Sequence, residues 1–319
     1  MTIGMRKGLT SRRHAGLTAD MAPVLPDCLR PQLSAVAPRM PLPPGTCDTH
    51  MHVFGEQARY PLDARRNYTP HVCTLDQYRD VMALCGIERA VLVQPSVYGS
   101  DNSLLLDALR EGGPAFRGVA VPHPDASEGE LAAMHAAGVR GVRLNLVNPA
   151  VLGIDEALAL SERTAALGWH LQVQVALDTA AGEAALRQIA VRVRVPLVVD
   201  HMGRPAPGPA PRTLAELLAT GRGWVKLSAP YRISRQPAPA HADLLPLVQS
   251  LVAANPERLL WASDWPHSER TQSTPHDADL VDLLALWVPD AAIRRRICVD
   301  NPARLYGTEE WAPSSGSFP

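Results

Sequence analysis

Residues 47–54, with the sequence CDTHMHVF, form a short apolar run in which two histidines alternate. Further short apolar runs follow it along the chain, at residues 90–94, 116–121, 141–146, 170–175, 196–201, 224–228 and 259–264. Runs of this length, separated by longer segments, are typical of the strands of a parallel sheet. Their number and order predict an α/β protein with a closed (β/α)8 TIM barrel.

Segments whose apolar residues recur at helical spacing lie between and after these runs. They are residues 104–111, 128–137, 155–167, 180–191, 214–220, 242–253, 277–288 and 291–299. The last two segments come after the final run and are predicted to close the barrel.

The length of the chain suits one large domain. It has 319 residues, and a barrel of this kind takes about 250. We predict the barrel over residues 46–310. Residues 1–45, rich in proline and arginine, are predicted to form a flexible N-terminal arm, and the Ser/Pro-rich residues 311–319 a frayed tail.

Composition narrows the class of partner. The net charge is −1 and the 31 basic residues are spread along the chain, which argues against a nucleic-acid partner. Every apolar run is far shorter than the roughly 20 residues of a membrane span. The five cysteines include no C-x-x-C pair, and the N-terminus lacks the apolar core of a secretion signal. We therefore predict a cytoplasmic protein that binds a small molecule, and a homo-oligomer stays open.

Four side chains are the strongest candidates for catalysis. His50 and His52 alternate along the first run and therefore point to one face of the predicted strand. His201 ends the sixth run and Asp264 ends the eighth, where barrel strands pass into active-site loops. Each residue alone could be a satisfied core residue or a helix cap. Together they predict a His/Asp site at the mouth of the barrel.

These positions carry a family resemblance. A His-x-His pair on strand one, a histidine on strand six and an aspartate on strand eight resemble the amidohydrolase superfamily. Longer stretches are similar to the 2-pyrone-4,6-dicarboxylate lactonase and sulfomuconolactone hydrolase group, whose frame sugar-acid lactone enzymes share. These stretches are DTHMHVFG (48–55), NYTP (67–70), VQPS (93–96), DHMGRP (200–205) and SDWPH (263–267). The resemblance implies a TIM-barrel hydrolase that opens a lactone.

The resemblance also bears on metal binding. Binuclear members of the superfamily use a lysine or glutamate on strand four and a histidine on strand five, whereas this chain has Arg143, Asn145 and Gln174 there. The lactonase group implies a site that works without metal, so no cofactor is predicted to be required. The alternative is one Zn²⁺ or another divalent ion, with the ligands His50, His52, His201 and Asp264.

Arginines are the candidates for binding an anionic substrate, because a guanidinium group binds a carboxylate through two N–H groups. They are Arg143 on strand four, Arg204 after strand six and Arg232 after strand seven. The other predicted substrate-binding residues are Tyr68, Gln94, Ser96, Asn145, Gln174 and His267. The resembled dicarboxylate lactonases carry a further arginine where this chain has Asn148-Pro149, and a tyrosine where it has Gln174. These departures argue against pyrone dicarboxylate itself as the substrate.

The predicted reaction is the addition of water to the carbonyl of a small anionic lactone, such as a pyrone dicarboxylate, a muconolactone or a sugar-acid lactone. Asp264 would be the general base, and the histidines would stabilise the oxyanion, either as hydrogen-bond donors or through a metal. One alternative is a zinc-dependent decarboxylase of an aromatic or unsaturated acid. Another is a barrel that binds an organic acid without chemistry. Lys226 is interpreted as structural.

Overall fold

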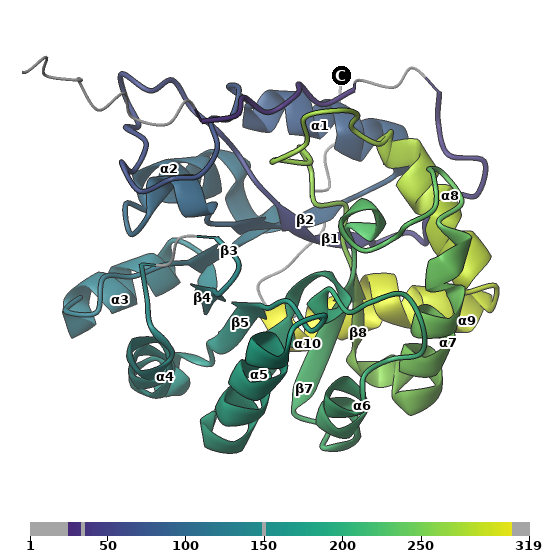
Figure 1. Ribbon diagram of the computed structural model, residues 1–319. Coiled ribbons are helices and arrows are strands. Elements are labelled where there is room, and N and C mark those ends of the chain that lie inside the picture. Colours follow the sequence, from purple (N-terminus) through teal and green to yellow (C-terminus); the bar gives the residue numbers. More distant parts are fainter. Residues whose placement is uncertain (1–24, 33–35, 149–150, 308–319) are drawn as a thin grey trace, which may run out of the picture.

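Eight parallel strands form one sheet in which each strand pairs with the next along the chain (Figure 1). The computed structural model describes residues 25–32, 36–148 and 151–307. The strands are β1 (Cys47–Met51), β2 (Arg89–Val93), β3 (Phe116–Ala120), β4 (Val139–Asn145), β5 (His170–Gln174), β6 (Leu197–Val199), β7 (Gly223–Leu227) and β8 (Leu259–Trp261). The predicted (β/α)8 architecture is confirmed.

The barrel closes between β1 and the segment that follows β8. Met51 lies opposite Trp265 in an isolated parallel bridge. The backbone N–H of His52 donates to the Trp265 carbonyl at 2.8 Å, and that of Asp264 donates to the His50 carbonyl at 3.0 Å. These bonds lie beside candidate catalytic residues, so closure of the barrel also fixes the backbone of the site.

Helices surround the sheet on the outside of the barrel, except the last one, which lies across one end of it (Figure 1). They are α1 (Leu75–Cys85), α2 (Ser103–Gly112), α3 (Glu128–Ala136), α4 (Ile154–Arg163), α5 (Ala180–Arg192), α6 (Arg212–Ala219), α7 (Leu245–Ala254), α8 (Asp277–Trp287), α9 (Ala291–Arg295) and α10 (Asn301–Tyr306). The predicted segment 291–299 divides into α9 and a π-helical turn over Arg296–Asp300.

Helix α1 is absent from the sequence prediction, although its ends carry recognisable signals. Thr74 and Gln77 form a capping box at its start, and Gly86 ends it in the left-handed conformation, with φ of 72°. A Thr-x-x-Gln pair before an apolar run and a glycine after it are the ordinary marks of a helix. These end signals were sufficient to predict the helix.

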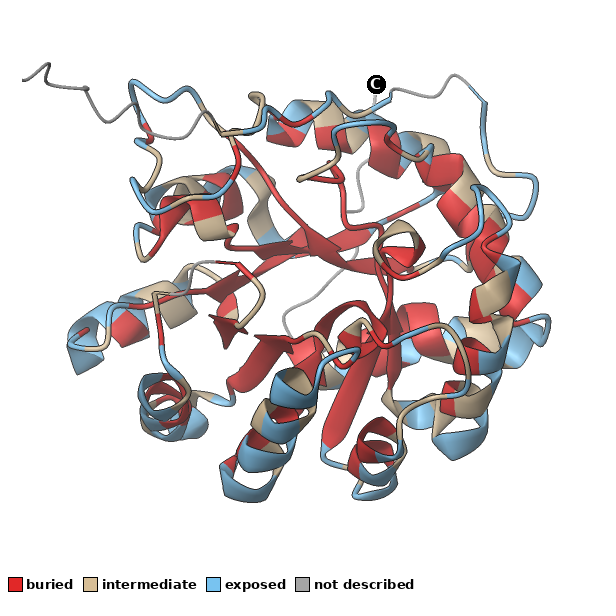
Figure 2. Cartoon of the chain, viewed as in Figure 1, coloured by how far each residue is buried: buried red, intermediate tan, exposed pale blue. Residues whose placement is uncertain are grey.

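The strands are buried on both faces, one inside the barrel and the other beneath the helices (Figure 2). Parallel strands in this position lie away from water along their length. A polar side chain that points into the barrel must therefore find its hydrogen-bond partners within the protein. Such side chains gather where the strands end, at the mouth.

Part of the predicted N-terminal arm lies against the barrel. The backbone N–H of Cys28 donates to the Thr69 carbonyl at 3.0 Å, and that of Leu29 donates to the Arg270 carbonyl at 2.7 Å. Residues 25–32 thus connect the loop after β1 with the loop after β8 instead of hanging loose. Residues 1–24 of the arm and the predicted tail lie outside the described residues. None of the helices described has the length and apolar character that crossing a membrane requires.

Candidate active site

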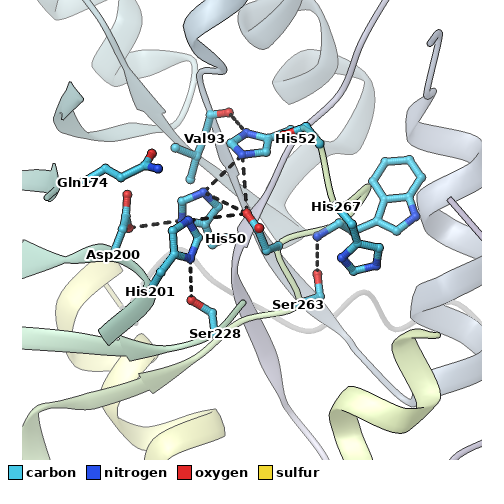
Figure 3. Close-up of polar contacts among 12 residues, drawn as sticks. His50, His52, Val93, Gln174, Asp200, His201, Ser228, Ser263 and His267 are labelled. Carbon is cyan, nitrogen blue, oxygen red and sulfur yellow. Dashed lines mark hydrogen bonds and ion pairs between the residues drawn. The ribbon is translucent and has the colours of Figure 1, made fainter. Parts of the chain in front are cut away.

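The four predicted catalytic residues meet at the mouth of the barrel, and Figure 3 shows the three histidines grouped there. His50 lies near the end of β1, His52 directly follows that strand, His201 follows β6 and Asp264 follows β8. His201 and Asp264 have left-handed backbones, with φ of 50° and 63°, which turn the chain away from the strand direction. All four side chains are buried. The structure thus brings these residues together, as the sequence predicted.

The carboxylate of Asp264 faces the Nε2 atoms of all three histidines. Its Oδ1 lies 3.7 Å from Nε2 of His50, 3.8 Å from Nε2 of His52 and 3.6 Å from Nε2 of His201. The Nε2 atoms of His50 and His52 are 3.2 Å apart. One carboxylate oxygen and three ring nitrogens therefore converge at the mouth.

His52 has a defined tautomer. Its Nδ1 lies 2.7 Å from the Val93 carbonyl oxygen, which can only accept a hydrogen bond, so Nδ1 carries a proton. Burial, followed by the nearby charge of Arg143, lowers the pKa of His52 to about 3. The ring is neutral at neutral pH and presents a lone pair at Nε2. The predicted role of hydrogen-bond donor does not suit this atom, whereas the role of metal ligand does.

The other two imidazoles are also held in orientation through their Nδ1 atoms. Nδ1 of His50 is 3.2 Å from Oδ1 of Asp200, and Nδ1 of His201 is 2.9 Å from the Ser228 hydroxyl (Figure 3). Burial lowers the pKa of His201 to about 4 and holds the pKa of His50 well below its ordinary value. All three rings are therefore neutral at neutral pH.

Asp264 is bound through one carboxylate oxygen. Oδ2 accepts hydrogen bonds from the Tyr231 hydroxyl at 2.7 Å and from Nε of Arg232 at 3.0 Å. Oδ1 is buried and has no hydrogen-bond partner among the described residues. Burial alone would raise the pKa of Asp264, but the guanidinium of Arg232 outweighs it and holds the pKa well below its ordinary value. The carboxylate is ionised, fixed in orientation and open toward the histidines.

A paired polar layer lies beneath the histidines. Asp200 accepts a hydrogen bond from Nε2 of Gln172 at 3.1 Å, and its Oδ1 lies 3.5 Å from Nζ of Lys226. The fully buried Lys226 donates to the Thr49 carbonyl at 2.7 Å and to Oε1 of Gln172 at 2.8 Å. These contacts fit the interpretation of Lys226 as structural, because its ammonium group balances the carboxylate that orients His50.

The donor set fits a single divalent metal ion. Protein zinc sites place nitrogen and carboxylate ligands about 2.0–2.2 Å from the ion, which puts neighbouring ligand atoms roughly 3.3 Å apart in a tetrahedron. The separations here are 3.2 Å between His50 and His52 and 3.6–3.8 Å from Asp264 to the three histidines. His50, His52 and Asp264 form one compact group of potential ligand atoms. Such an ion would satisfy both the unpartnered Oδ1 and the lone pair of His52.

Arg143, predicted to bind substrate, is braced by two neighbours. Its Nη1 donates to the Gln94 carbonyl at 2.5 Å and its Nη2 to Oε1 of Gln174 at 2.7 Å, while Nε is buried without a hydrogen-bond partner in the described ranges. The side-chain amide of Gln94 donates to the Asp101 carbonyl at 2.7 Å. Gln94 and Gln174 thus hold Arg143 and the loop after β2.

Arg232 and Arg204 differ in how many of their N–H groups are hydrogen-bonded within the protein. Arg232 donates to Asp264 and, at 2.9 Å, to the Ser268 carbonyl, so it positions the Asp264 carboxylate. Arg204 has a left-handed backbone with φ of 50°, and its Nε and Nη1 are buried without a hydrogen-bond partner in the part of the chain described. Of these two predicted arginines, Arg204 is the one with N–H groups available to an anion.

Two more predicted substrate-binding regions lie in the loops of the mouth. The buried Tyr68 hydroxyl hydrogen-bonds with Ser96, itself a predicted residue, and with Ser268. Oδ1 of Asn145 accepts hydrogen bonds from two backbone N–H groups of the loop after β4, both at 3.0 Å. The Asn145 amide nitrogen is buried without a hydrogen-bond partner among the residues described. The side-chain oxygen of Asn145 therefore fixes the loop after β4, and its side-chain nitrogen could donate a hydrogen bond to a ligand.

His267 does not face the mouth. It is fully buried, with Nδ1 3.1 Å from the Tyr231 hydroxyl and Nε2 3.2 Å from Oδ1 of Asp277. Both ring nitrogens thus lie against protein atoms. His267 thus contacts the tyrosine that binds Asp264, and its predicted contact with a substrate stays a prediction.

Residues 47–308 match the protein-family model described as Amidohydrolase. The chain belongs to the amidohydrolase family. It is 38% identical over 294 residues to the 4-sulfomuconolactone hydrolase of Hydrogenophaga intermedia, covering 89% of this chain and 96% of that protein. It is 35% identical to the 2-pyrone-4,6-dicarboxylate hydrolase of Comamonas testosteroni, covering 86% and 93%. The resemblance predicted from the sequence is confirmed.

This amidohydrolase is also similar to a solved structure from Agrobacterium tumefaciens. The TM-score is 0.76 and the sequence identity 29%, with coverage of 85% of this chain and 98% of the other. The likeness therefore extends over nearly the whole barrel, including the strands that carry the candidate site.

Several residues that touch the site of this amidohydrolase were missing from the prediction, among them Asp200, Ser228, Tyr231 and Glu269. Asp200 and Tyr231 contact His50 and Asp264, and Glu269 lies 3.4 Å from Nη1 of Arg232. The sequence offered only their adjacency to predicted residues as a signal, since Asp200 precedes His201 and Tyr231 precedes Arg232. Glu269 has no such signal in its loop.

Proposed function

We propose that this amidohydrolase hydrolyses a small lactone that carries an anionic group. The observation that supports the proposal best is the state of Asp264. Its Oδ2 is pinned by Tyr231 and Arg232, while its ionised Oδ1 is buried, unpartnered among the described residues and aimed at three neutral imidazoles. The sulfomuconolactone and pyrone dicarboxylate hydrolases to which the chain is similar support the reaction class.

Asp264 would orient and deprotonate the attacking water. A general base must lie within about 3 Å of the water oxygen, and Oδ1 is the carboxylate atom with room for that hydrogen bond. A low pKa makes Asp264 a weak base, so it accepts the proton as the new C–O bond forms rather than beforehand. Tyr231 and Arg232 keep the carboxylate from rotating during this step.

The histidines and Asp264 would hold a divalent ion, for which their donor atoms fit. When bound, such an ion supplies a Lewis acid that lowers the pKa of a bound water and polarises a carbonyl. The residues behind the imidazoles contribute orientation: the Val93 carbonyl and Asp200 fix the rings of His52 and His50, and Ser228 fixes that of His201.

Arg204 would bind the anionic group of the lactone. Its Nε and Nη1 are buried and have no hydrogen-bond partner among the described residues, and a carboxylate could accept hydrogen bonds from both. An anion fixed at one edge of the mouth would hold the ring so that its carbonyl faces the attacking water, which is the orienting effect that speeds a two-component reaction. Both Nη groups of Arg143 are already bound by the protein, so this residue would contribute only its positive charge to binding the anionic group.

The test is a spectrophotometric lactonase assay with pyrone dicarboxylate, a muconolactone and a sugar-acid lactone. The enzyme is used as purified, after chelation, and after addition of Zn²⁺. We expect ring opening of at least one lactone and loss of that activity in Asp264→Asn, with the chelated arm showing whether a metal is needed. Carbon dioxide release from an aromatic or unsaturated acid without lactone opening would overturn the proposal. So would binding of organic acids with no turnover in any arm.

A further inference from the structure

The mouth holds a second carboxylate that the proposed reaction does not use. Glu269 lies in the loop after β8, where its Oε1 accepts a hydrogen bond from Nδ2 of Asn148 at 2.7 Å and its Oε2 lies 3.4 Å from Nη1 of Arg232. Arg232 also binds Asp264. Glu269 is therefore separated from the catalytic carboxylate by one guanidinium group. Its side chain is 25% exposed, so part of it is in contact with solvent.

The backbone holds Glu269 in place. Its φ of 67° is in the left-handed region, which a residue with a side chain adopts only when its surroundings enforce it. Its N–H donates to Sγ of the buried Cys28 at 3.2 Å, and the next carbonyl, that of Arg270, accepts from the Leu29 N–H at 2.7 Å. Residues 25–32 thus fix the loop in the conformation that carries the Glu269 carboxylate to Asn148.

The charges around the mouth are unevenly balanced. Arg232 is paired with both Asp264 and Glu269. Both Nη groups of Arg143 are bound to uncharged oxygens. Arg204 keeps two buried nitrogens without a hydrogen-bond partner in the described ranges and lies within electrostatic range of Glu269. The mouth thus offers one guanidinium with two open nitrogens, together with an amide and carboxylate pair.

We propose that Glu269 and Asn148 select a lactone that carries a single anionic group and at least one hydroxyl group. The anionic group binds Arg204, and the hydroxyl donates a hydrogen bond to Glu269. A second anionic group on the ring is disfavoured, because it meets the Glu269 carboxylate in a partly buried site where like charges repel strongly. The inference rests on the proposed lactonase function and names its substrate class, a sugar-acid lactone with one free carboxylate.

A purely structural role for Glu269 predicts a different pattern. If Glu269 only balanced the charge of Arg232, its loss would disturb Asp264 and change the turnover of every lactone by a similar factor. A selecting carboxylate instead changes the ratio of kcat/KM between a singly and a doubly anionic lactone. The ratio is therefore the quantity to measure.

The first experiment compares wild type and Glu269→Gln with a sugar-acid lactone that bears one carboxylate and with pyrone dicarboxylate. We expect the ratio of kcat/KM, singly over doubly anionic, to fall by about tenfold or more in Glu269→Gln. The matched control is Glu216→Gln on α6, whose side chain is 52% exposed and pairs with Arg212 on the surface, and it should leave the ratio unchanged. An unchanged ratio in Glu269→Gln overturns the proposal.

The second experiment measures the binding preference in the absence of turnover. Asp264→Asn enzyme, with and without Glu269→Gln, is titrated calorimetrically with D-galacturonate and with isophthalate, two rings that lack a lactone bond. We expect galacturonate to bind more tightly than isophthalate, and Glu269→Gln to narrow or reverse that order. Asn148→Ala is a further variant should Glu269→Gln lose its fold, and it should weaken galacturonate alone.

The two proposals fail in distinguishable ways. In one outcome, the enzyme opens lactones and needs Asp264 to do so, but Glu269→Gln does not change the preference between singly and doubly anionic lactones. This outcome overturns the proposed selection by Glu269 and leaves the lactonase function standing. In the other outcome, the enzyme opens no lactone, but Glu269→Gln changes its binding preference between galacturonate and isophthalate. This outcome overturns the lactonase function and supports the selection by Glu269.

Discussion

Asp200 and Asp264 are fully buried carboxylates beside the same histidines, yet the protein holds them differently. Asp200 is bound on both oxygens, at Oδ1 by His50 and at Oδ2 by Gln172, with Lys226 alongside. Asp264 is bound on Oδ2 and leaves Oδ1 open toward the mouth. In both, burial would raise the pKa of the carboxyl, and neighbouring positive or polarised groups instead hold it well below its ordinary value.

The difference follows from depth in the barrel. Asp200 belongs to the layer inside the sheet, where an uncompensated charge costs several kcal/mol and each oxygen must be paired. Asp264 stands at the level where the strands end and a ligand can complete its contacts. The two aspartates therefore differ in the pairing of their oxygens, which suits Asp200 to supporting the fold and Asp264 to the proposed chemistry.

The largest expected effect is on turnover, from removing the open carboxylate. Asp264→Asn should lower kcat by on the order of 10²–10⁴-fold, because an amide cannot take a proton from water. The fold should survive, since the amide oxygen still accepts the hydrogen bond from Tyr231. Steady-state kinetics and a circular-dichroism melt measure both. Turnover equal to that of wild type would show that the open oxygen is not the base.

Next in size is the effect of breaking the paired layer. Lys226→Met leaves Asp200 buried without its cation and should lower the free energy of unfolding by about 3–5 kcal/mol. Adding Asp200→Asn to the same chain should recover part of that loss, because the uncompensated charge is then gone. Urea unfolding of the two variants and wild type gives the numbers. A loss below about 1 kcal/mol would place Lys226 outside the support of the fold.

A smaller effect sharpens the contrast among the arginines. Arg204→Gln should raise KM for an anionic lactone roughly 10–100-fold with a lesser change in kcat, because it removes charge-assisted hydrogen bonds to the substrate. Arg232→Gln should instead lower kcat, because Arg232 orients Asp264. Arg212→Gln on the surface of α6 is the control. Equal changes of KM in both site variants would contradict the division of roles.

The last expected effect is the dependence of stability on pH. Burial depresses the pKa of His201 to about 4 and that of His52 to about 3, from an ordinary 6.5. As the pH falls below 6.5, the unfolded chain takes up these protons before the folded one does, so the stability present above that pH is lost progressively toward pH 4. Urea midpoints at several pH values should show the decline, and His201→Gln should make it shallower. A flat profile in wild type would mean that the rings are not neutral and buried.

The sequence predicted the frame of the molecule well, because strands and helices leave local patterns. The apolar runs gave the order of the strands, and polar residues at strand ends pointed to His50, His52, His201 and Asp264. Helix α1 was missed although a capping box and a left-handed glycine mark its two ends.

The amino-acid sequence by itself determined the barrel and the converging His/Asp residues, since strand spacing and chain order dictate which side chains reach the mouth. Only the tertiary structure decided which polar atoms stay open. Arg232 meets Asp264 across 32 positions of sequence, and Asn148 meets Glu269 across 121. Contacts between distant loops leave no local pattern, so the roles of Arg232, His267 and Glu269 became visible only when the folded chain placed each partner within hydrogen-bond or ion-pair reach.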